Sequence, residues 1–381
     1  MVRVVFLTHN YPRWPGDYSG AALAVLARAL VRRGVSVRVV ALGGEDAAER
    51  IEQDGILIRR VRIPSRLGQA VFDQDAFAAR LRSPRRWDLL LRLRRRLRLA
   101  AEREVSAGAD LVHAHWWMPS GWAAPARVPQ VLTLQGTDAG LIRSSRLARA
   151  AARRLLGRTA LITAVSRSIG ETFQNVTGRF VGTEHVHPLP IESRGRPWTR
   201  GGSGAVMMGR LDAAGRVGLA LETVALLASR GHKLPLTVIG EGRRRAALQQ
   251  QARDLGVAEL VRFVGGMPPD QALGHLARAD LMLITTQGEL SAVPAQEALI
   301  SGVPVVTCWD SGAPVDVVPQ SGAGRLSLPA AEALAECVMS VRADRDALAA
   351  SRLVGEAWRT RLAPDHVAQV YEGWYRDALR G

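Results

Sequence analysis

A strand, helix, strand succession that begins near the N-terminus, and starts again after residue 204, limits the fold of this chain most strongly. Residues 2–8 are an apolar run, residues 21–33 have helical spacing and end at Gly34, and residues 35–42 and 56–63 are further apolar runs. A helix that connects two such strands implies that the strands are parallel, because the chain must cross over the sheet. The first part of the chain is therefore predicted to be an α/β domain.

The same alternation continues along the chain, with one interruption. Further strands of the first domain are predicted at residues 111–114, 130–134 and 161–165. Prolines and glycines then crowd into residues 188–204, which is the composition of a linker. Beyond it, strands are predicted at 205–208, 236–239, 261–264, 281–285 and 303–307, with helices at 217–229, 243–255, 271–277 and 293–300.

These elements predict two domains of the doubly wound α/β class. We expect an N-terminal domain at residues 1–190, a hinge at 191–203, a C-terminal domain at 204–360, and a C-terminal helix at 361–381 that packs toward the N-terminal domain. Ligands of open parallel sheets bind outside the carboxyl ends of the strands. We therefore expect a ligand-binding cleft between the carboxyl ends of the two sheets.

The cysteine content and the lengths of the apolar runs indicate in which cellular compartment the protein is found. The two cysteines, Cys308 and Cys337, are too few for a disulfide scaffold and favour a reducing compartment. The N-terminal run lacks the features of a signal peptide, and no run approaches the roughly 20 apolar residues that a membrane span needs. We expect a cytoplasmic protein that is soluble or peripheral to the inner face of the membrane.

The formal net charge of +16 is carried almost wholly by arginine. Such a charge is compatible with nucleic acid, with an anionic membrane surface or with phosphorylated ligands. It is equally compatible with a composition in which arginine replaces lysine throughout. Because no nucleic-acid-binding motif or base-stacking platform accompanies the charge, we expect no nucleic-acid partner.

The most informative segment carries two glutamates, Glu289 and Glu297, around the start of a predicted helix that follows the strand at 281–285. Residues 291–294 can present backbone N–H groups at the N-terminus of this helix, which is an anion-binding arrangement. Carboxylates beside such groups suit hydrogen bonding to sugar and ribose hydroxyls. The Gly-Val-Pro-Val-Val run at 302–306 makes this pattern far more specific than two glutamates alone.

This segment resembles the E-x7-E motif of retaining GT-B glycosyltransferases of family four. The resemblance covers nearly the whole chain, in the order that the family has. Residues 208–212 resemble its GRL phosphate loop, 238–242 its GxG turn and 261–265 the strand beside the nucleobase. Residues 11–20, 113–116, 119–121, 133–138 and 164–166 resemble further segments, most of them on the acceptor side of a bacterial subgroup. It implies a GT-B fold, in which two Rossmann-like domains face a central cleft.

The resemblance also implies the donor-side residues. Glu297 is expected to hold the ribose hydroxyls, Glu289 to contact the transferred sugar and Arg210 to pair with the diphosphate, whose charge grows as the glycosidic bond breaks. The other implied donor-side positions are Gly209, Gly240, Gly242, Gly265, Leu290, Ser291 and Ala292. The family reacts without a protein nucleophile and usually without a metal. A nucleotide diphosphate sugar is thus the expected co-substrate, with no cofactor and no metal.

Three departures from the family pattern concern the site. The usual lysine after the GRL loop is Gly215 here, and we expect the neighbouring Arg216 to take its place. The usual histidine of the T-x-H-G segment is Gln135, whose amide can donate to a hydroxyl but cannot carry a proton as histidine does. Leu290 and Ser291 replace the aromatic residue that commonly follows the first glutamate. These changes leave the identity of the donor sugar undetermined.

The acceptor-side positions implied by the resemblance are Asp17, Tyr18, Ser19, Gly20, His115, Trp116 and Asp138. His113 and His115 share one face of a predicted strand, a spacing that can begin a metal site but more often marks strand-end residues packed near a cleft. The tryptophans at 116, 117 and 122 suit either a sugar or lipid platform or the protein core.

Residues 80–103 are dense in arginine, and Leu90, Leu93, Leu97 and Ala100 fall at helical spacing among them. This pattern predicts a basic amphipathic helix. Two interpretations remain open at this stage. The helix docks on anionic lipid or on a phosphorylated acceptor, or it is a solvated helix whose leucine stripe covers the first sheet.

The sequence therefore predicts a retaining glycosyltransferase that moves a sugar from a UDP- or GDP-sugar to a lipid-linked saccharide, a polyol or a secondary metabolite. An anionic membrane surface is a further candidate partner. The alternatives are a basic protein that binds anionic surfaces or nucleic acid, and a GT-B relative that is catalytically degenerate or performs another reaction.

Overall fold

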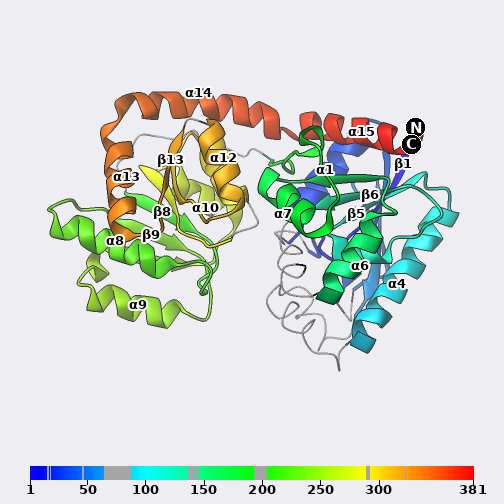
Figure 1. The fold of residues 1–381 in the computed structure, drawn as a ribbon, viewed down its shortest axis with the longest axis horizontal. Helices are drawn as coiled ribbons and strands as arrows, with labels where there is room; N and C mark the ends of the chain where they lie inside the picture. The colour runs from blue at the N-terminus through cyan, green and yellow to red at the C-terminus, as the bar shows by residue number, and fades with distance from the viewer. Residues whose placement is uncertain are drawn as a thin grey trace. The chain divides into compact units, whose positions relative to one another are not determined.

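The computed structural model describes residues 1–14, 17, 19–44, 47–63, 87–135, 142, 146–192, 204–288, 292–321 and 323–381. The chain divides into two compact units, of which unit 1 comprises Met1–Glu192 with Leu362–Gly381 and unit 2 comprises Ser193–Arg361. Each unit is a parallel or mostly parallel sheet covered by helices (Figure 1). The predicted α/β class is therefore confirmed.

Unit 1 is built on a seven-stranded sheet in the order β3-β4-β2-β1-β5-β6-β7. Its strands are β1 (Arg3–Leu7), β2 (Ser36–Gly43), β3 (Arg50–Gln53), β4 (Ile56–Arg62), β5 (Leu111–His115), β6 (Gln130–Leu134) and β7 (Leu161–Ala164). The pairings are parallel apart from that of β3 with β4. The strand order reverses at β1, so the carboxyl ends of β1 and β5 form a topological switch point, where such sheets bind ligands.

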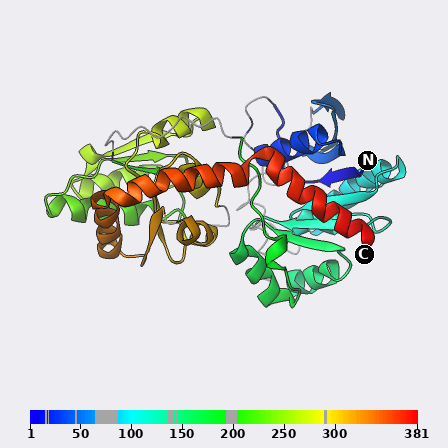
Figure 2. The ribbon, with the colours of Figure 1, turned by 90° about the horizontal axis from the view of Figure 1, so that it is seen from above.

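Helices cover both faces of this sheet (Figures 1 and 2). They are α1 (Ala21–Arg32), α4 (Trp87–Ser106), α6 (Arg146–Leu156), α7 (Arg167–Thr177) and α15 (Pro364–Arg380), with short turns η2 (Trp117–Gly121) and η3 (Thr183–His185). α1 and α15 share one core cluster, to which α15 contributes the buried Tyr371, Trp374 and Tyr375. The last helix of the chain thus completes the core of the first unit.

α4 contains the described part of the predicted basic helix, and residues 80–86 lie outside the described residues. Leu93 and Leu97 are buried with Ala100 against β1, β2 and β4, and Leu90 is buried as well. The leucine stripe therefore covers the sheet, which is compatible with both interpretations of this helix. Among the described helices, none is long and apolar enough to cross a bilayer.

Unit 2 is built on a six-stranded parallel sheet in the order β10-β9-β8-β11-β12-β13. Its strands are β8 (Ala205–Met208), β9 (Leu236–Ile239), β10 (Val261–Gly265), β11 (Leu281–Ile284), β12 (Val305–Cys308) and β13 (Gly324–Ser327). Its helices are α8 (Val217–Ser229), α9 (Arg245–Asp254), α10 (Pro269–Leu276), α11 (Val293–Ile300), α12 (Ala313–Ser321), α13 (Ala331–Ala343) and α14 (Arg345–Leu362), with a short turn η4 (Ala258–Leu260). The strand order reverses between β8 and β11, which makes their carboxyl ends the switch point of unit 2.

Candidate functional site

Backbone segments approach one another closely at the carboxyl ends of β8, β9 and β10. Gly209 N donates to Ile239 O at 3.0 Å, and Gly240 N donates to Gly265 O at 2.9 Å. A Cβ on Gly240 would overlap the carbonyl oxygen of Gly209, and one on Gly242 would overlap that of Leu211. Gly209 and Gly240 also have φ angles of 156° and 145°, which favour glycine. The structure thus brings the four predicted donor-side glycines into one group of adjoining turns.

A small cavity of about 20 Å³ lies beside these turns. Gly209, Arg210, Thr285 and Thr286 are among the residues that line it. The side chain of Arg210 is half exposed, and its Nη2 lies 3.1 Å from an oxygen of Asp212. An exposed guanidinium beside glycine turns, at a switch point, is an arrangement suited to an anionic ligand.

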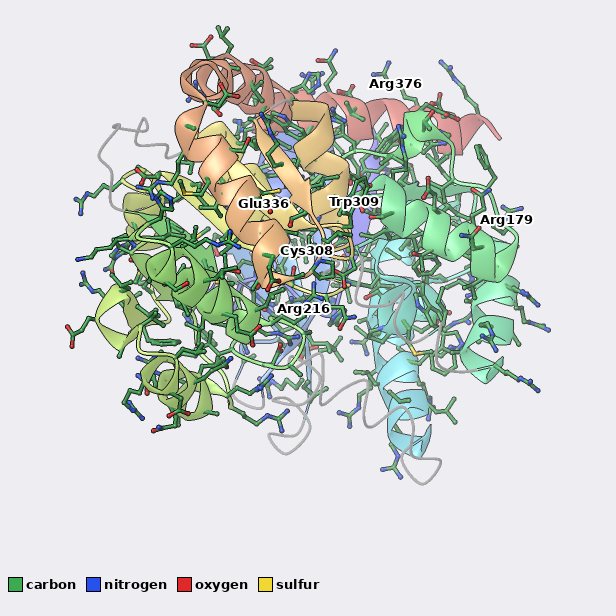
Figure 3. The ribbon with its side chains drawn as sticks, turned by 60° about the vertical axis from the view of Figure 1, so that its left-hand side comes forward. Arg179, Arg216, Cys308, Trp309, Glu336 and Arg376 are labelled. Carbon is green, nitrogen blue, oxygen red and sulfur yellow. The ribbon has the colours of Figure 1, made fainter. Side chains whose placement is uncertain are left out.

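Arg216 precedes α8 with a left-handed φ of 43°. Its Nε donates to Thr285 O at 2.7 Å, and Nη2 donates to Thr286 O at 2.9 Å. Nη1 and Nη2 form a bidentate pair with Asp310, at 2.8 and 2.6 Å. Figure 3 shows Arg216 in the same part of unit 2 as Cys308, which ends the strand before Asp310. Arg216 is therefore engaged by groups of the protein itself.

Glu297 lies on α11, as the fifth of its eight residues. Its side chain is partly buried, and burial raises the pKa of its carboxyl group to about 7. A carboxylate in such a place gains from a ligand that donates hydrogen bonds to it. Ala292 is the N-cap residue of the same helix. The other predicted residues of this segment, Glu289, Leu290 and Ser291, lie outside the described residues.

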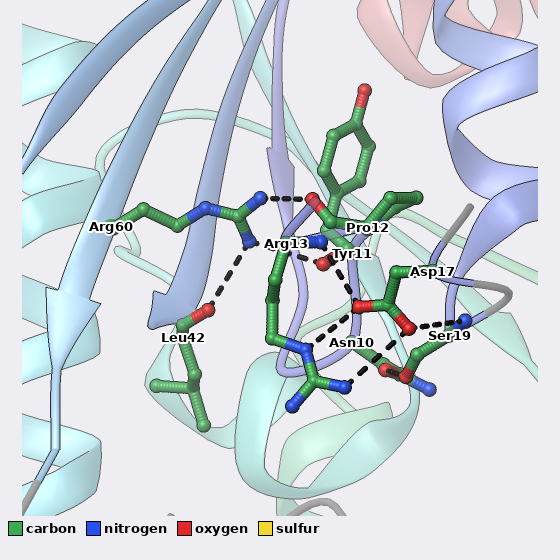
Figure 4. A network of polar contacts seen from close by, with 8 residues as sticks. All are labelled: Asn10, Tyr11, Pro12, Arg13, Asp17, Ser19, Leu42 and Arg60. Atoms are coloured by element: carbon green, nitrogen blue, oxygen red, sulfur yellow. Dashed lines mark hydrogen bonds and ion pairs between the residues drawn. The ribbon is translucent and has the colours of Figure 1, made fainter. Parts of the chain in front are cut away.

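Among the predicted acceptor-side residues, Asp17 organises the loop that precedes α1 (Figure 4). Its buried carboxylate accepts hydrogen bonds from the backbone N–H and Nε of Arg13, at 3.0 and 2.7 Å, and from Ser19 N at 3.1 Å. The Ser19 hydroxyl donates to the Asn10 side chain. Gly20 has a φ of 73°, and a Cβ there would overlap Asn10 O. Tyr18 lies outside the described residues.

Sequence reasoning missed Arg60, which secures the same loop from β4. Its buried guanidinium donates to Tyr11 O at 3.1 Å, to Leu42 O at 3.2 Å and to Pro12 O (Figure 4). Burial lowers the pKa of this guanidinium. In the sequence it is one of three arginines of this strand, with Arg59 and Arg62, and only the structure shows that Arg60 is the buried one.

The two strand histidines lie in the core of unit 1. His113 contacts Tyr375 Oη and Thr133 Oγ1, both at 2.7 Å, and burial lowers its pKa well below the usual value. His115 Nδ1 lies 2.8 Å from Gln135 Nε2. Because an amide nitrogen only donates, Nδ1 of His115 accepts and Nε2 carries the hydrogen. Burial lowers the pKa of His115 to about 3.

Trp116 is buried next to this pair, with a φ of 65°. Its ring lies 4.5 Å from that of His9, a residue that sequence reasoning had not singled out. Trp117 is fully buried, whereas Trp122 carries the guanidinium of Arg94 over its ring. These tryptophans therefore belong largely to the core. Within the described residues there is no group of three or more potential metal ligands, and Asp138 lies outside them.

Comparison with known proteins decides the family. Residues 20–190 match the profile of Glycosyltransferase Family 4, and residues 200–353 match that of Glycosyl transferases group 1. The chain is a family-four-type GT-B glycosyltransferase. The resemblance noted in its motifs is thereby confirmed, as is its assignment as a transferase enzyme.

The relatives of this glycosyltransferase act on diverse substrates. It is 29% identical over 231 residues to the GDP-mannose-dependent alpha-(1-6)-phosphatidylinositol monomannoside mannosyltransferase of Mycolicibacterium smegmatis, over 56% of this chain and 60% of that protein. The matched stretch thus spans about three fifths of such relatives. In structure it resembles sucrose-phosphate synthase of Thermosynechococcus elongatus, with a TM-score of 0.71, 16% identity, and coverage of 99% of this chain and 98% of that chain.

A second structural neighbour of the glycosyltransferase was solved with ligands. Anabaena HepE in complex with UDP and glucose superposes with a TM-score of 0.67 and 18% identity, over 99% of this chain and 100% of that chain. Likeness at such identities establishes the fold. The substrate has to be inferred from the residues of this chain.

Proposed function

We propose that this glycosyltransferase transfers a sugar from a nucleotide diphosphate sugar to an acceptor hydroxyl, with retention of anomeric configuration. One observation carries the proposal: a group of closely packed glycine turns at the switch point of unit 2 lies beside the half-exposed guanidinium of Arg210. A diphosphate is the leaving group whose growing charge such a guanidinium would stabilise. Glu297, on the helix that follows β11, would accept hydrogen bonds from the ribose hydroxyls.

A thermal-shift screen against UDP, GDP and their sugar conjugates tests the donor. A ligand that binds only the native state stabilises it, by about 2.7 kcal/mol at a concentration one hundred times its Kd. We expect at least one nucleotide, and its sugar conjugate, to raise the melting temperature. If neither UDP nor GDP nor any conjugate does so, the proposal is wrong. Proton NMR of the glycoside formed would then report whether the anomeric configuration is retained.

We further propose that the acceptor is presented at an anionic membrane surface, on which α4 docks. The inner stripe of α4 is used in packing, yet Leu91 and Leu99 on its outer side remain about half exposed. Exposed Arg92, Arg95 and Arg96 accompany them. Apolar side chains interleaved with arginine suit a surface of anionic lipid headgroups. A lipid-linked saccharide is the acceptor class that this docking favours.

A further inference from the structure

We propose that Arg216 serves the donor site as a positioning residue, with Asp310 as its fixed counter-ion, rather than as a ligand of the diphosphate. This inference rests on the proposed function, because it assigns a role at the same donor site. In this role Arg216 holds the loop after β11 in place within unit 2.

The contacts of Arg216 leave little of its guanidinium for a ligand. A guanidinium carries five N–H groups. Nε donates to Thr285 O, and Nη2 donates to Thr286 O. The bidentate pair with Asp310 occupies one further N–H on each of Nη1 and Nη2. A diphosphate would have to displace a carboxylate that already satisfies the same fork geometry.

What Arg216 holds is the loop that leads into the glutamate-bearing segment. Thr285 Oγ1 donates back to the carbonyl oxygens of Gly215 and Arg216, at 3.1 and 3.0 Å. Gln287 N donates to Ala214 O at 2.8 Å. The loop after β8 and the loop after β11 are therefore joined by hydrogen bonds in both directions around this guanidinium.

The loop after β12 is joined to the same assembly. Gly288 N donates to Asp310 O at 2.8 Å, and the Ser311 hydroxyl donates to Thr286 O at 2.9 Å. Asp310 thus binds the β11 loop with its backbone and Arg216 with its side chain. Gly288 directly precedes Glu289 in the sequence. Loss of the Arg216–Asp310 ion pair would therefore disturb the position of the chain at the start of the predicted donor-binding segment.

Holding the loop after β11 requires arginine, whereas a role that needs only a positive charge would not. Only a planar fork can reach two carbonyl oxygens and a carboxylate at once, whereas an ammonium group is a point charge. A diphosphate ligand at this position would need mainly the positive charge, which lysine supplies. The two roles therefore predict opposite outcomes for Arg216→Lys.

Titration calorimetry with UDP and GDP, on the full chain, tests the proposal. Arg216→Lys and Asp310→Asn should each weaken the binding of whichever nucleotide the wild type takes by roughly ten-fold, the worth of a lost charge-assisted hydrogen bond. The double variant should be no weaker than the worse single variant, because both act through one pair. Asp344→Asn breaks another Arg–Asp pair of unit 2, with Arg325, and should leave the affinity unchanged.

The sign of the Asp310 effect decides between the roles. If Arg216 binds the diphosphate directly, Asp310→Asn frees its guanidinium and removes a negative charge, so nucleotide binding should tighten. Tighter or unchanged binding by Asp310→Asn, or wild-type affinity in Arg216→Lys, would overturn the proposal while leaving the proposed function intact. A wild type that binds neither nucleotide would instead remove the proposed function, and this inference with it.

Discussion

The carbonyl oxygen of Gly209 occupies the space that a Cβ atom on residue 240 would need. Residue 240 also has a φ of 145°, outside the range that L side chains adopt readily. Two strand-end turns of unit 2 can therefore lie against each other only while Gly240 remains a glycine.

Gly240→Ala should consequently destabilise unit 2. Backbone strain and overlap with a backbone atom together should cost more than about 2 kcal/mol. The matched control is Gly274→Ala on α10, where a Cβ would meet nothing within 4 Å and alanine favours the helix. Chemical denaturation of the two variants measures the difference. A Gly240→Ala variant as stable as the control would show that the turns can separate freely.

Glu297→Gln should weaken nucleotide binding. The two ribose hydroxyls would lose a charged acceptor, and hydrogen bonds to charged groups are worth about 1.5–3 kcal/mol. In the wild type, affinity should rise as the pH increases through about 7, because only the ionised carboxylate accepts from both hydroxyls. Calorimetry at pH 6 and pH 8 measures both effects. Unchanged affinity in a folded variant would remove Glu297 from the donor site.

The same variant should be more stable than the wild type at alkaline pH. Burial raises the pKa of Glu297 from 4.5 to about 7 in the folded chain. The folded state therefore resists ionisation, and the wild type loses stability as the pH rises from 4.5 toward 7. Glutamine has no charge to bury, so Glu297→Gln should gain on the order of 2 kcal/mol above pH 7 and little below pH 4.5. Denaturation at both pH values checks this, and an equal effect at the two would contradict it.

Arg210→Ala should reduce turnover far more than Arg376→Ala. In the proposed reaction Arg210 would lie where charge builds on the leaving group, so its loss should act mainly on the transition state, by about 10²-fold or more in kcat. Arg376 is equally exposed but lies on α15 (Figure 3), and it pairs with Glu372. Initial rates of the two variants, measured with the donor that the thermal-shift screen identifies, test this difference. Equal rates for the two variants would take Arg210 out of the reaction.

Docking through α4 predicts binding to anionic vesicles that weakens with salt. Each basic residue near an anionic bilayer is worth about 1 kcal/mol, and the attraction fades within a Debye length. Replacing Arg92, Arg95 and Arg96 by Gln should therefore reduce co-sedimentation with phosphatidylserine vesicles at low salt. Phosphatidylcholine vesicles are the control. Equal binding to both lipids, or to neither, would favour a soluble acceptor.

The fold could be predicted from the sequence because its strands are buried and apolar. Residues 217–229 were predicted as a helix and form α8 with those bounds. β3 was missed because Arg50–Gln53 is polar and mostly exposed, so no apolar alternation marks it. The strand β13 was missed as well, since Gly324–Ser327 is short and only partly buried.

Residues of the candidate site could be predicted only where they lie within one short sequence motif. Glycines that allow backbone contact are visible in one segment at a time, so Gly209 and Gly240 could be singled out. The partner of Arg216 could not, because Asp310 lies on another strand end and only the folded sheet brings them together. Arg60 was missed for the same reason, since its acceptors lie on distant segments.

The return of α15 to unit 1 has a consequence for synthesis on the ribosome. Tyr371 and Tyr375 are fully buried among residues of the first helix and strands, in one core cluster with Leu26. Those earlier segments emerge hundreds of residues before their partners do. Unit 1, most of which is translated before unit 2, is therefore completed only after unit 2 has been made, and until then its nascent core would expose an apolar face to chaperones or to incorrect contacts.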